Sequence, residues 1–203
     1  MNALIIIDVQ NDFLPGGALP VKDGDVIIPV INNLQNKFDL VVATQDWHPF
    51  DHKSFASSHP GKKVFEEINL NGLPQVLWPD HCVQETSGAK FSPLLHTKKV
   101  EAIFRKGMDI NIDSYSGFFD NGKKKATGMD AYLKGRGITN IYVAGLAADY
   151  CVNFTALDGL QVGFDATIIT DATRAIDPEN FKKVLKDFKE KGGKEITSEE
   201  INF

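Results

Sequence analysis

The sequence predicts a three-layer α/β domain, with a mostly parallel central sheet flanked by helices. Five apolar runs rich in β-branched residues alternate with stretches of helical periodicity. Most of these runs are continuously apolar, which is typical of strands buried on both faces of a parallel sheet. The 203 residues are 42% apolar and 24% charged, and no linker or internal repeat divides them. We therefore expect a single domain over residues 1–203 with a sizeable core.

The expected strands and helices follow one another along the chain. The strands are expected at Ala3–Val9, Leu40–Thr44, Ala102–Arg105, Ile141–Leu146 and Ala166–Thr170. The helices are expected at Asp25–Lys37, Thr127–Lys134, Tyr150–Gln161 and Pro178–Lys191. Gly135 and the pair Gly192-Gly193 mark two helix ends, because glycine adopts the left-handed conformation that closes a helix. Pro29 fits only near a first turn, so the start of its helix stays open.

Residues 46–100 do not follow this alternation. They are rich in His, Pro, Trp and Asp and show little periodicity. Long irregular segments in compact domains are usually functional or disordered, and disordered segments generally lack aromatic residues. We therefore expect a metal- and substrate-binding insertion loop here.

Composition excludes several classes of function. The net charge of −5 and the pI of about 5.5 give no basic surface for nucleic acid. No apolar run is long enough for a signal peptide or a membrane span. With only Cys82 and Cys151, the chain is expected to be cytoplasmic and reduced, and to act on small molecules. The sequence leaves a homo-oligomer open.

Polar side chains gather where the predicted strands end. Asp8 follows the first strand, Asp46 and His48 the second, Lys106 the third, and Ala147–Cys151 the fourth. Ligands of open parallel sheets bind beyond the carboxyl ends of the strands. A carboxylate, a potential metal pair, an amine and a thiol are therefore expected at one sheet edge.

Cys151 is the strongest candidate nucleophile. It is expected where a buried strand passes into a helix, and the N–H groups of a helix N-terminus favour thiolate over thiol. The same N–H groups could hold an oxyanion. Lys106 could hold the thiolate and Asp8 could carry a proton to a leaving nitrogen. Taken singly, the alternatives are a buried structural cysteine, an exposed lysine and a capping aspartate.

Asp46, His48 and His81 indicate a metal site, with His52 as a candidate fourth ligand. A carboxylate and an imidazole two residues apart beyond a strand can share an ion. Mixed nitrogen and oxygen ligands suit zinc, iron or manganese. The alternative for any single histidine is an ordinary hydrogen-bonded residue.

Four aromatic residues could line a pocket for a flat ring: Phe13, Trp78, Tyr115 and Tyr150. Aromatic residues more often belong to the core. Trp78 is the best candidate, since it lies three residues before His81.

Five segments resemble, in order, the motifs of the nicotinamidases, a family of the cysteine-hydrolase superfamily that also contains isochorismatases. They are Asp8–Phe13, Thr44–Pro49, Trp78–Val83, Arg105–Gly107 and Gly145–Val152. The resemblance implies an isochorismatase-like hydrolase fold and hydrolysis of nicotinamide, and of pyrazinamide, to the acid and ammonia in NAD salvage.

The resemblance also implies roles for individual residues. Asp8, Lys106 and Cys151 would form the triad that makes a thioester, with an oxyanion hole at the N–H groups of Ala147 and Cys151. A cis peptide is expected between Leu146 and Ala147. Asp46, His48 and His81 would bind one divalent metal ion that orients the ring nitrogen, with zinc favoured over iron or manganese. His52 would bind the ion directly or hold a metal-bound water. The four aromatic residues match pocket-lining positions.

Three other readings stay open at this point. One is another cysteine amidohydrolase or an isochorismatase-type enzyme of the same superfamily. The second is a metallohydrolase in which the ion activates water and Cys151 is incidental. The third is a binding module without catalytic activity.

Overall fold

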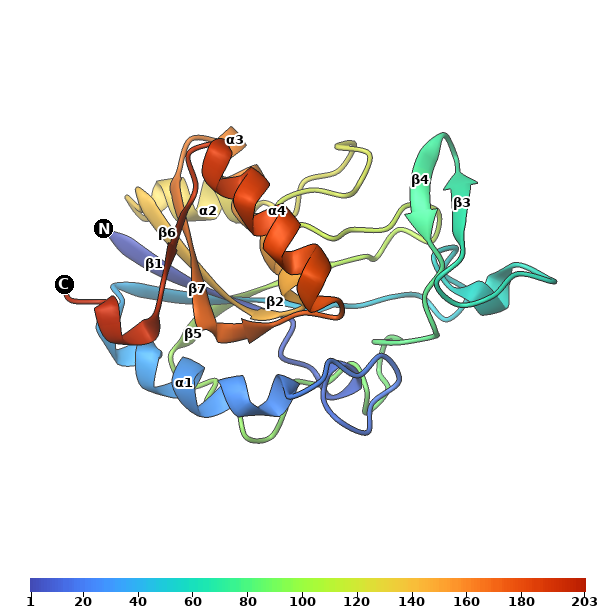
Figure 1. Ribbon diagram of the computed structural model, residues 1–203, viewed down its shortest axis with the longest axis horizontal. Coiled ribbons are helices and arrows are strands. Elements are labelled where there is room, and N and C mark those ends of the chain that lie inside the picture. The colour runs from blue at the N-terminus through green and yellow to red at the C-terminus, as the bar shows by residue number, and fades with distance from the viewer.

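A six-stranded sheet forms the centre of the computed structural model, which describes residues 1–203 (Figure 1). Its strand order is β5-β2-β1-β6-β7-β8, and every neighbouring pair is parallel. The strands are β1 (Asn2–Ile7), β2 (Leu40–Asp46), β5 (Val100–Lys106), β6 (Asn140–Leu146), β7 (Asp165–Arg174) and β8 (Lys194–Ile196). The predicted three-layer α/β fold with a parallel sheet is confirmed.

The two edge strands of the sheet, β5 and β8, lack the continuous run of buried apolar residues that is typical of its interior strands. Burial alternates along β5, because an edge strand with a partly open face does not need continuous apolar residues. β8 is only three residues long and was not predicted, because its sequence Lys-Glu-Ile carries no apolar pattern.

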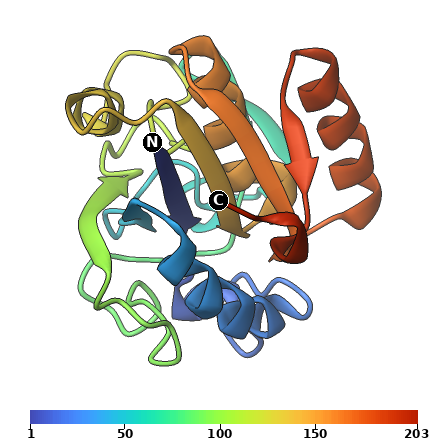
Figure 2. The ribbon, with the colours of Figure 1, turned by 90° about the vertical axis from the view of Figure 1, so that its left-hand side faces the viewer.

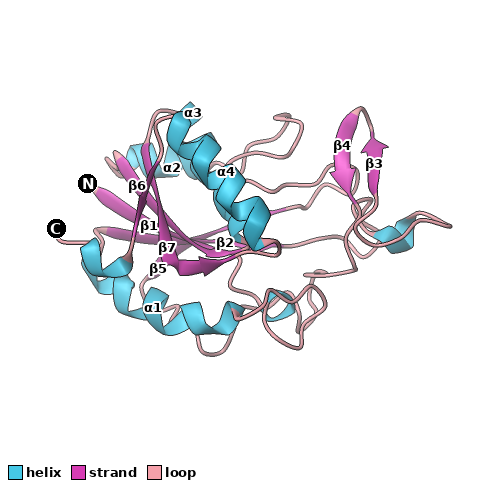
Figure 3. Cartoon of the chain, viewed as in Figure 1, coloured by secondary structure: helices cyan, strands magenta, loops and turns pink.

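Helices cover both faces of the sheet (Figures 2 and 3). The α-helices are α1 (Ile27–Leu34), α2 (Met129–Gly135), α3 (Asn153–Gln161) and α4 (Pro178–Glu190). Short 3-10 turns lie at Asn11–Phe13, Gly24–Val26, Gln35–Lys37, Ala56–Ser58 and Ser198–Glu200. No helix combines the length and the apolar character that crossing a bilayer requires.

Side chains alternate between two cores along β1, as the pleat of a strand requires. Leu4 and Ile6 belong to the core beneath α1, whereas Ala3, Ile5 and Ile7 belong to the core beneath the other helices. β1 is therefore buried on both faces and holds the site at its carboxyl end.

The predicted helix Tyr150–Gln161 begins differently from the expectation. A π-helical turn occupies Ala148–Val152, and α3 starts only at Asn153. Cys151 thus lies in a widened turn between strand and helix. π-helical turns are frequent at functional sites.

The segment of residues 46–100 contains a β-hairpin that was not predicted. Its strands, β3 (Glu67–Leu70) and β4 (Leu73–Val76), pair antiparallel and project away from the sheet (Figure 1). The turn is Asn71-Gly72, with φ of +54° and +89°. Asn-Gly is a strong hairpin signal, so the sequence did hold the information.

Candidate active site and metal centre

The carboxyl ends of β1, β2, β5 and β6 meet, as predicted, and bring the candidate residues together. Asp8, Asp46, His48, His81, Lys106 and Cys151 are all buried. Oxygens of Asp8 and Asp46 and the Cys151 sulfur lie within 4.8 Å of one another. The site is thus a dense group of ionisable side chains inside an apolar frame.

Lys106 lies at the centre of this group. Its Nζ is 2.6 Å from Asp46 Oδ1, 2.9 Å from Asp8 Oδ2 and 3.5 Å from Cys151 Sγ. It also donates to the carbonyl of Ser114 at 3.0 Å. Burial acts to lower the pKa of Lys106, but Asp46, then Asp8 and Cys151, raise that pKa well above its usual value. Lys106 is therefore a fixed positive charge.

Asp8 is held by two partners. Its φ of +47° lies in the left-handed region, which aspartate tolerates better than most residues. The Thr44 hydroxyl donates to Asp8 Oδ1 at 2.7 Å, while Oδ2 faces Lys106. Burial raises the pKa of the Asp8 carboxyl, against the opposing effect of Lys106. A carboxyl with a raised pKa is suited to take up and release a proton.

Cys151 follows a close contact between two strands. Gly145 has φ of +120°, and a Cβ there would lie 2.1 Å from the Ile7 carbonyl oxygen, so only glycine fits. The expected cis peptide between Leu146 and Ala147 is present. Burial raises the pKa of the Cys151 thiol well above its usual value, and Lys106 offsets this only in part. Burial therefore opposes formation of the thiolate, which the turn at the helix N-terminus and Lys106 are expected to favour.

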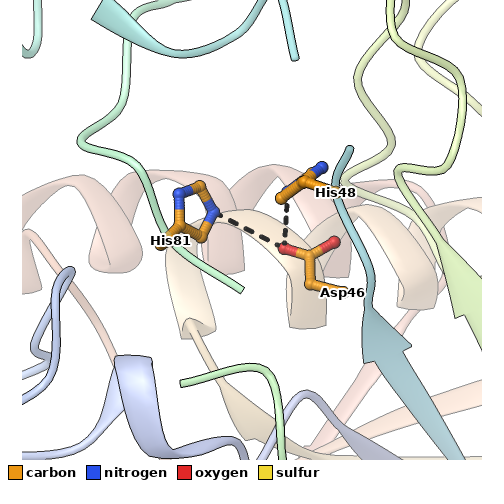
Figure 4. A group of neighbouring side chains, drawn as sticks. All are labelled: Asp46, His48 and His81. Carbon is orange, nitrogen blue, oxygen red and sulfur yellow. Dashed lines mark ion pairs between the residues drawn. The ribbon is translucent and has the colours of Figure 1, made fainter. Parts of the chain in front are cut away.

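Asp46, His48 and His81 form a group suited to a metal ion (Figure 4). Asp46 Oδ2 lies 3.3 Å from His48 Nε2 and 3.7 Å from His81 Nε2. Burial raises the pKa of Asp46, but Lys106 and then His48 bring that pKa well below its usual range. Asp46 is therefore an anion.

Backbone carbonyls fix the tautomers of these two histidines. His48 Nδ1 lies 2.9 Å from the Gly107 oxygen and His81 Nδ1 lies 2.8 Å from the Pro79 oxygen. Against the effect of burial, Asp46 raises the pKa of the His48 ring. In its neutral form, with the proton on Nδ1, each ring would present an Nε2 lone pair toward the carboxylate of Asp46. His48 Nε2 is buried and has no hydrogen-bond partner. Two lone pairs and a carboxylate therefore fit a divalent cation, with the tautomers set by backbone acceptors.

His52 lies beside His48 in a second group. Its ring centroid is 4.5 Å from that of His48, and it clusters with His48 and Asp113 rather than with Asp46 and His81. Ser54 N–H donates to His52 Nδ1 at 3.2 Å, which leaves the ring proton on the buried Nε2. Burial lowers the pKa of His52 to about 4. His52 is therefore held as a neutral ring whose buried Nε2 has no hydrogen-bond partner within the protein.

The sequence analysis assigned no role to three supporting residues, Gln10, Gly107 and Thr44. The Gln10 side chain binds both backbone groups of Asp46, donating to its oxygen and accepting from its N–H, each at 2.8 Å. Gly107 has φ of +66°, and a Cβ there would lie 2.4 Å from His48 Cε1. Thr44 and Gln10 are polar residues inside or next to buried strands, and this was the signal available for them.

Three of the four predicted pocket aromatics lie together. Trp78 contacts Tyr150 edge to face, with ring centroids 4.9 Å apart, and lies 6.3 Å from Tyr115. The rings of Tyr115 and Tyr150 are 5.4 Å apart. Phe13 instead contacts the ring of His81 at 5.4 Å. The aromatic residues thus border both the thiol and the metal group.

The fold and this site have counterparts among known proteins. The family model described as the isochorismatase domain matches residues 2–200. The nicotinamidase of Escherichia coli is 49% identical over 178 residues, which cover 86% of this chain and 83% of the relative.

Two solved structures extend the comparison. The nicotinamidase/pyrazinamidase of Acinetobacter baumanii superposes with a TM-score of 0.95 at 47% identity, covering 98% of this chain and 96% of that one. The pyrazinamidase of Pyrococcus horikoshii in complex with zinc gives a TM-score of 0.79 at 38% identity, with 97% and 98% coverage.

Fold and site together therefore define an α/β protein with the isochorismatase-like hydrolase architecture. The chain belongs to the isochorismatase family, and within that family to the nicotinamidases.

Proposed function

We propose that the protein hydrolyses nicotinamide, and its analogue pyrazinamide, to the carboxylic acid and ammonia. The observation that supports this best is the position of Lys106 Nζ. It contacts Asp8 and Cys151 on one side and the metal-site carboxylate of Asp46 on the other. A nucleophile, a proton carrier and a substrate-orienting site are thus within reach of one bound molecule, as a small aromatic amide requires.

Cys151 begins the reaction by attacking the carboxamide carbon. The thiol proton passes to Asp8, which lies next to the sulfur, as the sulfur–carbon bond forms. The N–H groups of Ala147 and Cys151 then hold the resulting oxyanion. Lys106 stabilises the negative charge on sulfur and on Asp8 throughout.

Asp8 carries the same proton onward. It protonates the leaving nitrogen as the carbon–nitrogen bond breaks, so that ammonia departs and a thioester remains. Water then attacks the thioester while Asp8 accepts its proton. The sulfur leaves, takes the proton back from Asp8, and the acid is released.

Asp46, His48 and His81 would hold one divalent metal ion, for which we propose zinc. When bound, the ion supplies a Lewis-acid contact for the ring nitrogen of the substrate. His52 is proposed to act through a metal-bound water, because its Nε2 carries the ring proton. The zinc complex of the Pyrococcus horikoshii pyrazinamidase supports this choice of metal.

Phe13, Trp78, Tyr115 and Tyr150 are proposed to bind the flat substrate ring by contact with their own rings. The whole chain would act as one domain, in which residues 46–100 supply the metal and ring contacts. We further propose a role in NAD salvage in a reducing compartment such as the cytoplasm, because Cys151 must remain a free thiol.

Ammonia release from nicotinamide by the purified protein tests the proposal. Cys151→Ala should abolish release, and alkylation of the wild-type thiol should do the same. If turnover survived both treatments, the thioester route would be wrong and metal-activated water would be favoured. A matched control is Cys82→Ala, since Cys82 is a buried free thiol outside the triad.

A further inference from the structure

The β3–β4 hairpin has only one fully buried side chain in its strands, and this side chain is polar. Gln75 is 3% exposed, whereas the other residues of β3 and β4 are exposed or half-buried. A groove of about 440 Å³ lies alongside the hairpin, lined also by residues of α3 and α4. The hairpin is therefore not packed against these helices there, and Gln75 is its main buried attachment.

The amide of Gln75 reaches the wall of the aromatic pocket. Its Nε2 lies 3.0 Å from Asp113 Oδ2 and 3.2 Å from Tyr115 Oη. It also donates to the Val76 carbonyl at 2.8 Å, so its two N–H groups serve three acceptors and one N–H is shared between two of them. A buried amide nitrogen is costly to leave unpaired, so these contacts restrict where the side chain can lie.

The contact defines the role of the Tyr115 hydroxyl. Because Gln75 donates to Tyr115 Oη, the hydroxyl proton of Tyr115 remains free to point elsewhere. Burial raises the pKa of Tyr115 well above its usual value, so this proton is retained at neutral pH. The ring of Tyr115 contacts those of Trp78 and Tyr150, which are also proposed to bind the substrate ring.

The same amide is connected to the catalytic lysine. Asp113 Oδ1 accepts from the Ser114 N–H at 2.8 Å, and the Ser114 carbonyl accepts from Lys106 Nζ at 3.0 Å. Gln75 thus contacts, through Asp113, the backbone that supports the centre of the site.

We propose that Gln75 is a positioning residue for substrate binding, which holds the ring and hydroxyl of Tyr115 against the substrate. This inference rests on the proposed function, because it takes Tyr115 to be part of the substrate pocket. Gln75 itself does not touch the reacting atoms.

Replacement of Gln75 by methionine, which has a similar length and no donor, tests the role. We expect the KM for nicotinamide to rise about three- to tenfold, the range for one lost hydrogen bond, while kcat changes less than twofold. In a Tyr115→Phe background the same replacement should raise KM by a smaller factor, because the Tyr115 acceptor is already absent and only the contact with Asp113 is lost. If Gln75→Met raised KM by the same factor in the wild type and in Tyr115→Phe, the proposal would be contradicted.

Asn71→Gly is the matched control. Asn71 lies in the turn of the same hairpin and donates to the Asn111 carbonyl at 3.0 Å, in the same segment that carries Asp113. Glycine keeps the positive φ of the turn. If this variant raised KM as much as Gln75→Met does, general anchoring of the hairpin would explain the effect and the positioning role would be wrong.

Binding measured without turnover separates the two proposals. The dissociation constant of nicotinamide for Cys151→Ala protein, followed by tryptophan fluorescence, should rise with Gln75→Met by the same factor as KM. Binding without ammonia release by the wild type would contradict the proposed function alone. An unchanged dissociation constant would contradict the role of Gln75 alone, and absence of binding would contradict both.

Discussion

The carboxylate of Asp46 joins the candidate metal group, Asp46, His48 and His81, to the proposed catalytic residues Asp8 and Cys151 through Lys106. Oδ1 accepts from Lys106 Nζ at 2.6 Å, while Oδ2 faces the imidazoles of His48 and His81. Lys106 therefore balances two buried carboxylates, those of Asp46 and Asp8. A change at either carboxylate alters the charge that the other one experiences.

Removal of the Lys106 charge should damage both stability and activity. In Lys106→Met the carboxylates of Asp8 and Asp46 would be left buried without a counter-ion. Breaking a buried ion pair in this way costs about 3–5 kcal/mol, and we expect a loss of that size in the free energy of unfolding in urea. Ammonia release should be lost as well.

Lys125→Met provides the control for this experiment. Lys125 pairs with Asp109 at 2.5 Å, but its side chain is 69% exposed. Exposed pairs contribute little, so unfolding and turnover should remain close to those of the wild type. Equal losses in the two variants would show that burial of the Lys106 group is not what matters.

Much of this arrangement could be predicted because it follows from the ends of buried strands. Asp8, Asp46, Lys106 and Cys151 follow or end apolar runs, so one rule about parallel sheets brings them to one edge. The contacts that hold them could not be predicted in the same way. Gln10 meets Asp46 and Gln75 meets Tyr115 across 36 and 40 residues of sequence, and no local pattern encodes such pairs.

The charge state of Cys151 shows a different limit. A helix terminus can be predicted from sequence, but the degree of burial that opposes it cannot. Here burial raises the pKa of the Cys151 thiol more than Lys106 lowers it. Chemical reactivity thus depended on packing, which only the three-dimensional arrangement shows.

Metal content should depend on His81 but not on His96. His81→Ala removes one of the three candidate ligand atoms of the group Asp46, His48 and His81, whereas His96 is exposed and lies outside the group. We expect the purified wild type and His96→Ala to hold one divalent ion per chain, measured by atomic emission, and His81→Ala to hold much less. A full complement in His81→Ala would rule out this ligand set.

Acid should destabilise the metal-free protein partly through His52. The pKa of His52 is about 4 in the folded protein, against an ordinary value of 6.5 for histidine. Between these values the unfolded chain binds more protons than the folded one, so stability is present above pH 6.5 and falls as the pH drops toward 4. The difference between these two pKa values corresponds to a loss of at most about 3 kcal/mol in the free energy of unfolding.

The difference between the wild type and His52→Gln isolates this effect. Both proteins are treated with a chelator, and the free energy of unfolding in urea is measured from pH 7.5 to 4. The wild type should lose more stability than the variant across that window, because glutamine does not titrate. Parallel pH curves would mean that His52 is not held neutral by burial.

Replacement of Gly107 by alanine should weaken metal binding, whereas the same replacement at Gly128 should not. Both glycines have positive φ, +66° and +87°, so alanine would strain the backbone at either position by about 1 kcal/mol. A Cβ at Gly128 would meet nothing within 4 Å, whereas one at Gly107 would lie 2.4 Å from His48 Cε1. Gly107→Ala must therefore also displace the imidazole that the Gly107 carbonyl orients.

We expect Gly128→Ala to lose only stability. Gly107→Ala should lose roughly a further 1–3 kcal/mol in the free energy of unfolding. It should also lose metal affinity, measured by competition with a chromogenic chelator. Equal metal affinities in the two variants would show that His48 is not positioned by this close contact.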